Sequence, residues 1–457
     1  MFFIHFLIFI VNTEICRSYL LLSFDDRFRA PLRIPPNSKD IGEPLILTPY
    51  IKSNQISKAR ELSSVNSLLG DKSIVSNSGY FTVDETHNSN LFFWFFRKSS
   101  SDWKNAPFLL WLQGGPGISS MYGLFEENGP YTMTENGLKK RNHSWTNYYN
   151  VLYIDQPVGT GFSFTNSSDG FIGTQEKVAD HLYEALTQFF KFYPELKPNA
   201  FYITGESYAG KFIPSISHKI HNLKKANLTD INLKGLFMTS AYTNGLANGL
   251  ANFCFQTGII DSQTKTRLQV QERKIESYIK SEIWYNASIL AKELIYKIVN
   301  ISRVDMYDYR KLDAVTTEKY AQFLNEIRIR KKLHVGNKDF FPSSNSVFNN
   351  FTEDISKSVV PLVEELVEHY PVAFVGGQFD IVVAYPLALN VMKKLNWSGA
   401  SDYKTAKRNI LGKNVDGYYK SAGNLKDIFI RNAGHMVTRD QPRAILDLLE
   451  KFVNDKL

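Results

Sequence analysis

The sequence predicts an α/β protein with a central, mostly parallel sheet that is interrupted by a helical insertion. Near-continuous apolar runs rich in β-branched and aromatic residues recur along the chain, as in strands buried on both faces of a sheet. A helical pattern separates two of these runs, which favours a parallel pair joined by a right-handed crossover. From about residue 246 to 330 the runs give way to long amphipathic stretches, which predict a helical cap.

The strand-like runs follow one another in the first half of the chain, and a helix is expected between the fourth and the fifth. Within residues 174–196 the apolar side chains recur at helical spacing, and Pro194 follows the end of the pattern. These apolar positions are Val178, Leu182, Ala185, Leu186, Phe189 and Phe190. The runs read GYFTV (79–83), LFFWFF (91–96), FLLWLQGG (108–115), VLYIDQP (151–157), FYITGES (201–207) and LKGLFMTS (233–240).

The insertion contains two amphipathic stretches that predict helices, at residues 264–284 and 289–300. Strand-like runs return at 371–383 and 427–435, and a closing helix is expected at 441–454. No internal repeat is found. We therefore expect a first part of an α/β core at 73–245, the helical cap at 246–330 and the second part of the core at 331–457.

Residues 1–17 have the character of a secretory signal peptide. Their apolar core, residues 2–11, has the length of a signal-peptide core and is too short to span a bilayer. It lacks a basic first region, so a buried terminal strand is the alternative, and cleavage would fall near Cys16 or Ser18. Residues 18–72 predict a loosely packed extension or a removable pro-segment. No later run is apolar enough for a membrane helix, so no membrane span is expected.

The chain has only two cysteines, Cys16 and Cys254. If Cys16 leaves with the signal peptide, no intramolecular disulfide can form. Few cysteines would normally indicate the cytosol, but seven Asn-x-Ser/Thr sequons and the signal-like start favour the secretory pathway. The expected destination is outside the cell, or a lysosome or vacuole. The sequon asparagines are Asn142, Asn166, Asn227, Asn286, Asn300, Asn350 and Asn396.

The net charge of +8 is best interpreted as a solvated basic surface. We find no arginine-rich arm and no basic run interleaved with aromatic residues, so no nucleic-acid partner is expected. The sequence has no HExxH motif and no cysteine–histidine cluster, so neither a metal nor another cofactor is expected. The oligomeric state is not predicted.

Ser207 is the candidate nucleophile. It lies in the turn GESYAG (205–210), between an apolar strand and a predicted helix. A sharp turn of this kind presents a serine hydroxyl at the edge of a sheet, and small neighbours permit its strained backbone. The general pattern has glycine two residues after the serine, where this chain has Ala209 and then Gly210. The alternative is that Ser207 only caps the helix.

Two later strand ends supply the groups that a serine nucleophile needs, a base and an acid that orients the base. Asp380 follows an apolar strand and a Gly-Gly turn, and His435 follows the next strand in a Gly-His loop. The order Ser207, Asp380, His435 is that of an α/β-hydrolase sheet. His181 and His218 lie inside predicted helices, where a surface or core role is expected.

The motif WLQGGPG (111–117) contains the end of an apolar strand and the glycine-rich turn that follows it. Backbone N–H groups there can face a developing oxyanion because Gly115 has no side chain in the way. The second donor would be the N–H of Tyr208, the residue after the nucleophile. An ordinary tight turn is the alternative, whereas a phosphate loop is excluded because no Gly-Lys-Ser/Thr follows.

Six motifs in order make the sequence resemble the serine carboxypeptidase family, from about Gly79 to the C-terminus. They are WLQGGPG, YIDQPVGTGFS, GESYAG, LHVG, GGQFDIVV and NAGHMV. The glutamine of the first motif, an NWSG segment and the spacing before His435 most resemble the vitellogenic-like carboxypeptidase branch. The resemblance implies an α/β-hydrolase fold and an enzyme that removes single residues from the C-termini of peptides or proteins.

The resemblance also implies a role for each matching residue. Ser207 would form the acyl-enzyme, His435 would act as general base and then acid, and Asp380 would orient His435. Gly115 and Tyr208 would supply the oxyanion N–H groups.

A substrate carboxylate site is implied beside the nucleophile. It would consist of Trp111, Gln113, the Gly114 N–H and Glu206, with Glu127 hydrogen-bonded nearby. Two carboxylates in a partly dry site do not both ionise easily, so the pair would keep a proton. A protonated Glu206 can donate a hydrogen bond to the terminal carboxylate of a peptide, so activity is expected to be favoured at acid pH.

The sequence departs from the family pattern in three respects. Family members usually carry disulfides around the insertion, and this chain cannot. Thr239-Ser240-Ala241 and then Asn244-Gly245 replace a glycine-containing turn followed by Asp-Pro, which should alter a backbone turn near the site. Glu126 replaces a large apolar residue, and would favour basic side chains in the pocket for the leaving residue.

Two other functions stay open at this stage. The first is acyl transfer or ester cleavage by the same triad. The second is a catalytically impaired secreted binding protein.

Overall fold

The structure, a computed structural model, describes residues 41–245, 249–312 and 319–457. The predicted signal peptide at 1–17, Cys16 and the first part of the predicted extension lie outside the described residues.

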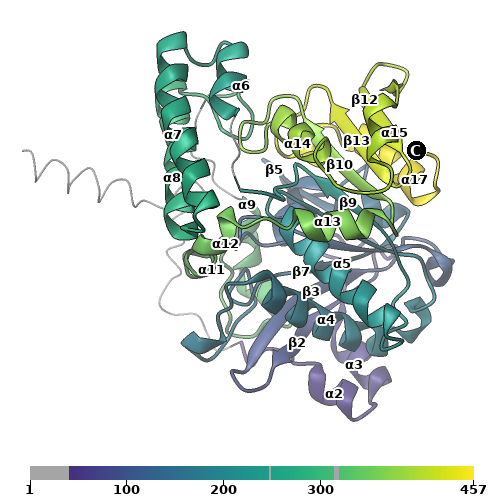
Figure 1. Cartoon of the computed structure of the whole chain (residues 1–457). Coiled ribbons are helices and arrows are strands. Elements are labelled where there is room, and N and C mark those ends of the chain that lie inside the picture. The colour runs from purple at the N-terminus through teal and green to yellow at the C-terminus, as the bar shows by residue number, and fades with distance from the viewer. Residues whose placement is uncertain (1–40, 246–248, 313–318) are drawn as a thin grey trace, which may run out of the picture.

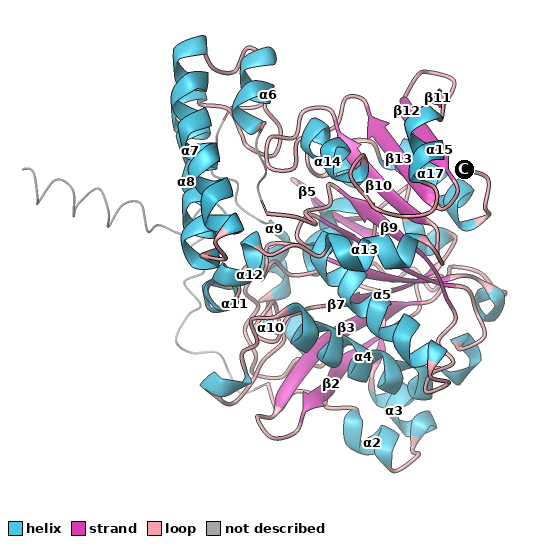
Figure 2. Ribbon diagram, viewed as in Figure 1, coloured by secondary structure: helices cyan, strands magenta, loops and turns pink. Residues whose placement is uncertain are grey.

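All but two of the strands of the described residues form one large mixed sheet with a parallel centre (Figures 1 and 2). Its order is β1-β2-β3-β7-β4-β8-β9-β10-β13-β12-β11, and the strands from β7 to β13 in this order run parallel. The outer strands on both sides are antiparallel. The predicted mostly parallel sheet is therefore confirmed. The strands are β1 Ser64–Val65, β2 Ser76–Asp84, β3 Ser89–Phe96, β4 Phe108–Leu112, β7 Asn150–Ile154, β8 Phe201–Glu206, β9 Leu233–Thr239, β10 Val372–Gly377, β11 Arg408–Leu411, β12 Gly417–Ala422 and β13 Leu425–Ile430. A separate hairpin pairs β5 Tyr131–Thr134 with β6 Gly137–Lys140.

Helices cover both faces of this sheet, which explains why its central strands are apolar throughout. Successive side chains of β4 point to opposite faces, so Leu110 belongs to the core cluster that includes residues of helices α4 (Gln175–Phe192) and α5 (Ala209–Lys225). Trp111 lies on the other face, in a second core cluster that includes residues of helix α17 (Pro442–Val453). Two hydrophobic cores thus hold the carboxyl ends of the parallel strands in fixed positions.

The described part of the N-terminal extension is packed against the core. Leu47 and Ala59 are fully buried, and the backbone of Leu47 donates a hydrogen bond to Tyr80 O at 2.9 Å. Helices α2 (Thr48–Lys52) and α3 (Ile56–Leu62) lie beside α4. The loose packing that we expected for this segment is therefore wrong for its described part, because its apolar side chains complete the core cluster on that face.

The cap consists of α6 (Leu250–Gln256), α7 (Ser262–Lys280) and α8 (Trp284–Ser302), which stand beside the sheet (Figure 1). Cys254 is buried and free, so packing and hydrogen bonds hold these helices together. Glu272 Oε1 accepts from the backbone N–H of Ala251 at 2.8 Å, and Lys297 Nζ donates to Gln271 Oε1 at 2.7 Å. The apolar cluster of the cap also includes Ile381, next to the candidate catalytic aspartate.

Two short helices near the end of the predicted cap range, 246–330, pack in the main core. Tyr320 and Leu324 of α9 (Lys319–Leu324) and Ile329 of α10 (Ile327–Lys332) are buried in the same cluster as the sheet residue Trp94. The remaining helices are α11 Asn345–Asn350, α12 Thr352–Ser356, α13 Val360–Val367, α14 Tyr385–Met392, α15 Ala400–Thr405 and α16 Val437–Asp440. In the described ranges, no helix has the length and apolarity that a bilayer crossing requires.

Candidate active site

Ser207 lies at the turn between β8 and α5, with a φ of 63° in the left-handed region. This turn leaves room only for small neighbours. A Cβ on Gly205 would come within 2.2 Å of Leu112 O, and one on Gly210 within 2.7 Å of Tyr242 N. Ala209, which stands where the general pattern has glycine, is accommodated and buried. Tyr208 occupies the N-cap position of α5, and no side chain caps this end of the helix. Ser207 is therefore not its side-chain cap.

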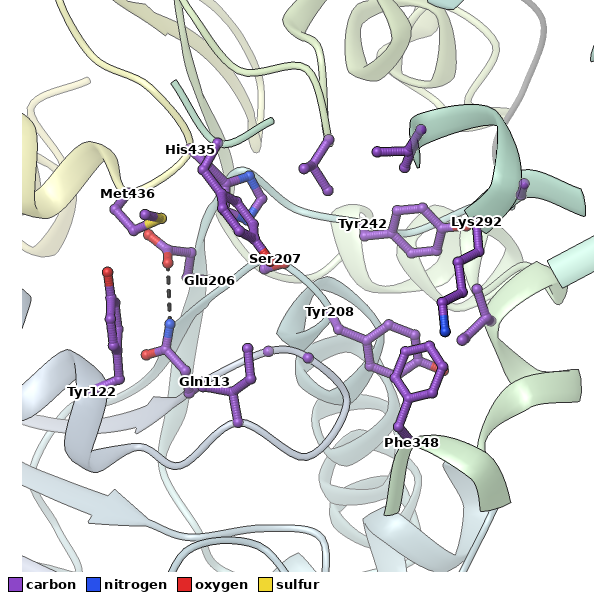
Figure 3. Close-up of a pocket in the computed structure, with 18 of the residues that line it drawn as sticks. Gln113, Tyr122, Glu206, Ser207, Tyr208, Tyr242, Lys292, Phe348, His435 and Met436 are labelled. Atoms are coloured by element: carbon purple, nitrogen blue, oxygen red, sulfur yellow. Dashed lines mark hydrogen bonds between the residues drawn. The ribbon is translucent and has the colours of Figure 1, made fainter. Parts of the chain in front are cut away.

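His435 and Asp380 form a buried pair beside Ser207. His435 Nδ1 lies 2.7 Å from Asp380 Oδ2, and Asp380 Oδ1 accepts from the backbone N–H of Val383 at 2.9 Å. Since the carboxylate accepts, Nδ1 carries the proton and Nε2 is the basic atom. Among the described residues Nε2 has no hydrogen-bond partner, and it shares with Ser207 a solvent-open cleft of about 870 Å³ (Figure 3). The structure thus brings together the three residues of the predicted triad.

The chain after the cap fixes both loops of this pair. The N–H of His435 donates to Tyr307 O at 2.6 Å, and the N–H of Ile381 donates to Met306 O at 3.1 Å. The N–H of Tyr309 donates to Phe379 O at 3.1 Å. Residues 306–309 therefore hold the aspartate loop and the histidine loop at once.

Ser240 occupies a position where we expected an altered turn. It adopts a φ of 43°, a left-handed conformation that glycine would reach at lower cost. Its hydroxyl donates to His435 O at 2.7 Å, and its N–H donates to Val375 O at 2.7 Å. The serine side chain therefore adds a support for the histidine loop.

The glycine turn of the WLQGGPG motif lies directly against the nucleophile. A Cβ on Gly114 would come within 2.6 Å of Tyr208 N and 2.7 Å of Ser207 Cβ, so only glycine fits there. Gly115 has a φ of 111° and lines the cleft together with Tyr208. Both predicted oxyanion donors are therefore next to the serine.

Asp155 holds this turn in place. The sequence shows that Asp155 follows a buried strand, but it does not reveal this role. It accepts hydrogen bonds from Ser119 Oγ at 2.6 Å and from the N–H of Ser120 at 2.9 Å. Ser120 Oγ in turn accepts from the N–H of Gln113 at 3.2 Å. Complete burial raises the pKa of Asp155 to about 7.

Gln113 joins two buried glutamates next to the serine. Its Nε2 donates to Glu206 Oε1 at 3.1 Å (Figure 3), and it lies 3.4 Å from Glu127 Oε1. Its Oε1 accepts from the indole N–H of Trp111 at 2.9 Å, which fixes the orientation of the amide. Gln113, Gly114 and Glu206 line the cleft, whereas Trp111 and Glu127 are buried behind them. Trp111 thus acts through Gln113, whereas Glu127 contacts both Gln113 and Glu206.

The two glutamates both have raised pKa values. Burial raises the pKa of Glu206 well above its usual value, and the charge of Glu127 and a hydrogen bond with it raise this pKa further. Burial also raises the pKa of Glu127, although its contacts with Glu206 and Arg439 oppose the increase. The pair therefore holds a proton at pH values where exposed glutamates are ionised, and this proton makes it a hydrogen-bond donor.

Further residues at this cleft were not identified from the sequence. Arg439 donates to Tyr122 Oη at 3.0 Å, and Tyr122 lines the cleft near Glu206 (Figure 3). Glu126, which we expected in the pocket for the leaving residue, is not among the described residues that line the cleft. Burial raises its pKa, while the charges of Arg141 and Arg439 oppose this. In the sequence, the one signal for Tyr122 and Arg439 is that each lies close to a recognised motif.

A serine on a strand–helix turn, a histidine–aspartate pair and an adjacent glycine turn define a serine hydrolase. The chain belongs to the serine carboxypeptidase family, whose profile matches residues 69–455. It is therefore a serine-type carboxypeptidase, and its substrates are peptides.

Similar proteins come from insects and mammals. The chain is 40% identical to the venom serine carboxypeptidase of Apis mellifera, with 92% of this chain and 93% of the relative covered. It is 39% identical to the probable serine carboxypeptidase CPVL of Homo sapiens, with 94% of each chain covered. The vitellogenic carboxypeptidase of Aedes aegypti is 38% identical, with 92% of each chain covered. The predicted resemblance to this branch is confirmed.

A solved structure with the same architecture is that of Kex1(delta)p, a prohormone-processing carboxypeptidase from Saccharomyces cerevisiae. The TM-score is 0.76 at 24% identity, with 87% of this chain and 95% of that chain covered. This likeness confirms the predicted α/β-hydrolase fold.

Proposed function

We propose that this carboxypeptidase removes one C-terminal residue at a time through an acyl-enzyme on Ser207, with binding favoured at acid pH. The observation that carries the proposal is the Glu206–Gln113–Glu127 cluster, whose Glu206 and Gln113 line the same cleft as the nucleophile, with Glu127 buried behind them. A proton-bearing carboxyl pair at this place can bind the terminal carboxylate of a peptide.

The reaction begins when the terminal carboxylate accepts hydrogen bonds from Gln113, the Gly114 N–H and protonated Glu206. Ser207 Oγ attacks the scissile carbonyl and its proton passes to His435 Nε2, while Asp380 stabilises the imidazolium. The N–H groups of Gly115 and Tyr208 stabilise the oxyanion.

The tetrahedral intermediate collapses when His435 gives this proton to the leaving nitrogen. The C–N bond breaks, the terminal amino acid departs and an ester on Ser207 remains. Water then attacks the ester with His435 again as base, the C–Oγ bond breaks as His435 returns this proton to Ser207 Oγ, and the shortened peptide leaves.

The test is a pH-resolved digest of a peptide mixture with mass detection. Successive single-residue losses from C-termini, absent in Ser207→Ala, are expected. Internal cleavage, or losses that persist in Ser207→Ala, would contradict the proposal.

Two alternatives use the same framework. Acyl transfer or ester cleavage would show transfer products with ester donors and added nucleophiles. An impaired binding protein would stay unlabelled by a fluorophosphonate probe while folded, whereas the proposal expects labelling of Ser207.

We also propose that the protein passes through the secretory pathway, as a secreted or a lysosomal or vacuolar enzyme. All seven sequon asparagines are exposed, which leaves each accessible to a glycan. A glycosidase-induced mass shift in the purified native protein tests this. The sequon positions are Asn142, Asn166, Asn227, Asn286, Asn300, Asn350 and Asn396.

A further inference from the structure

The cleft extends to two sides of Ser207. On one side lie Glu206, Gln113 and Tyr122, and on the other lie Tyr208, Tyr242, Phe348 and Lys292 (Figure 3). If the terminal carboxylate of a peptide binds at Glu206, the leaving residue occupies the first side. The residue before it, which is acylated onto Ser207, then faces the second side. We call this second side the acyl arm.

The walls of the acyl arm are mostly apolar, and the cap provides one of them. Tyr208 and Tyr242 stack at 6.1 Å between ring centroids, and Phe348 comes from α11. The cap helix α8 adds Ala291, Ile295 and Lys292. Long methylene chains of a substrate can therefore pack here before they reach a charged group.

Lys292 places its ammonium group in this apolar arm. Its Nζ lies 4.9 Å from the centroid of the Phe348 ring, and Figure 3 shows the amine directed toward Tyr208 and Phe348. Of the described residues that line the cleft, it is the one lysine or arginine. The carboxylate of Asp354, behind Tyr208, is paired with Lys211 at 3.0 Å.

We propose that Lys292 makes the enzyme prefer peptides whose penultimate residue is glutamate. The inference rests on the proposed function, because it needs the terminal carboxylate at Glu206. A glutamate side chain has the methylenes to pass the aromatic rings and a charge to pair with the ammonium group. Charge pairing in a partly dry arm is stronger than at an open surface, because water screens it less.

Blocked dipeptides with a common C-terminal leucine and a penultimate Glu, Gln, Leu or Lys test the proposal. Glu and Gln have the same shape, so the ratio of their kcat/KM values isolates the charge. At about pH 5.5, where the substrate glutamate is ionised, we expect a ratio of about 10. The ratio should fall toward 1 below about pH 4, as the substrate glutamate becomes protonated.

Variants of Lys292 give the matched comparison. Lys292→Met should bring the Glu/Gln ratio close to 1, Lys292→Arg should retain most of it, and Lys292→Glu should favour penultimate Lys over Gln. Lys280→Met removes an exposed lysine of the same cap and should keep the wild-type ratio. Each ratio is measured within one preparation, so differences in folded fraction cancel.

The outcomes separate the two proposals. If no blocked dipeptide is cleaved by folded enzyme, the proposed function is wrong. If Gln and Leu substrates are cleaved but Glu is no better than Gln, or if Lys292→Met keeps the preference, the inference is overturned and the proposed function stands.

Discussion

Glu206→Gln should remove most of the pH dependence of substrate binding. In the wild type, the raised pKa of Glu206 keeps a proton on the Glu206–Glu127 pair at acid pH, and this proton supports binding of a carboxylate. As pH rises through the pKa of the pair, the donor is lost and a negative charge appears beside the substrate carboxylate. KM should therefore rise with pH. A glutamine amide donates at every pH, so the variant should respond much less.

The size of the effect follows from the contacts. A hydrogen bond to a charged group contributes about 1.5–3 kcal/mol. Two like charges about 4 Å apart repel by about 4 kcal/mol at an effective dielectric constant near 20. Because solvent and counter-ions reduce this repulsion, we expect KM of the wild type to rise about 100-fold, from acid pH to well above the pKa of the pair. In Glu206→Gln the rise should stay under about threefold, since Glu127 then titrates without a partner.

The assay measures KM and kcat separately for one blocked dipeptide from about pH 4 to pH 8, since kcat also follows the protonation of His435. Glu126→Gln is the matched control, because Glu126 is the neighbouring glutamate but does not line the cleft. It should keep the wild-type slope. A flat KM in the wild type, or a full slope in Glu206→Gln, would refute this account of carboxylate binding.

Four further outcomes are expected. Arg439→Met should move the rise of KM to higher pH, because the charge of Arg439 lowers the pKa of both glutamates; an unchanged or lower midpoint in the pH–KM profile would contradict this. Ser240→Ala should lower the free energy of unfolding, measured by urea denaturation, by about 1 kcal/mol and lower kcat/KM several-fold, because His435 O loses its hydrogen bond. Thr266→Ala is the control and should have neither effect, because the Thr266 hydroxyl donates to Ser262 O in its own helix. The free energy of unfolding should fall as pH rises above about 4.5, the usual pKa of a glutamate, because the folded pair binds protons more tightly than the unfolded chain; a Glu206→Gln, Glu127→Gln double variant should show a smaller fall in the same titration. Dithiothreitol should leave activity and melting temperature unchanged, because Cys254 is free; loss of activity would show that a disulfide matters.

Much of the site could be predicted because its residues follow strands. Ser207, Asp380 and His435 each come after a buried apolar run, and parallel strands carry such residues to one edge of a sheet. The glycine turn was predictable for the same reason, since it follows β4. Local patterns therefore specified both the sheet and its chemistry.

The rest depends on contacts between segments that are far apart in the sequence. Lys292 lies on an amphipathic helix, where no local signal distinguishes a lysine in a cleft from a solvated one. Tyr122 and Arg439 meet across 317 positions of sequence. The packing of residues 45–65 also escaped prediction, because a few scattered apolar side chains complete the core only when the sheet is already formed.

The backbone bonds of residues 306–309 to the aspartate and histidine loops have a consequence for engineering. A cap that only covered the cleft could be exchanged between relatives as a separate cassette to alter selectivity. Here the segment that directly follows the cap also sets the spacing between Asp380 and His435, so a graft that included it would change catalytic geometry together with selectivity. A chimaera should therefore keep residues 304–312 from the recipient and place its junction before them, at the end of α8.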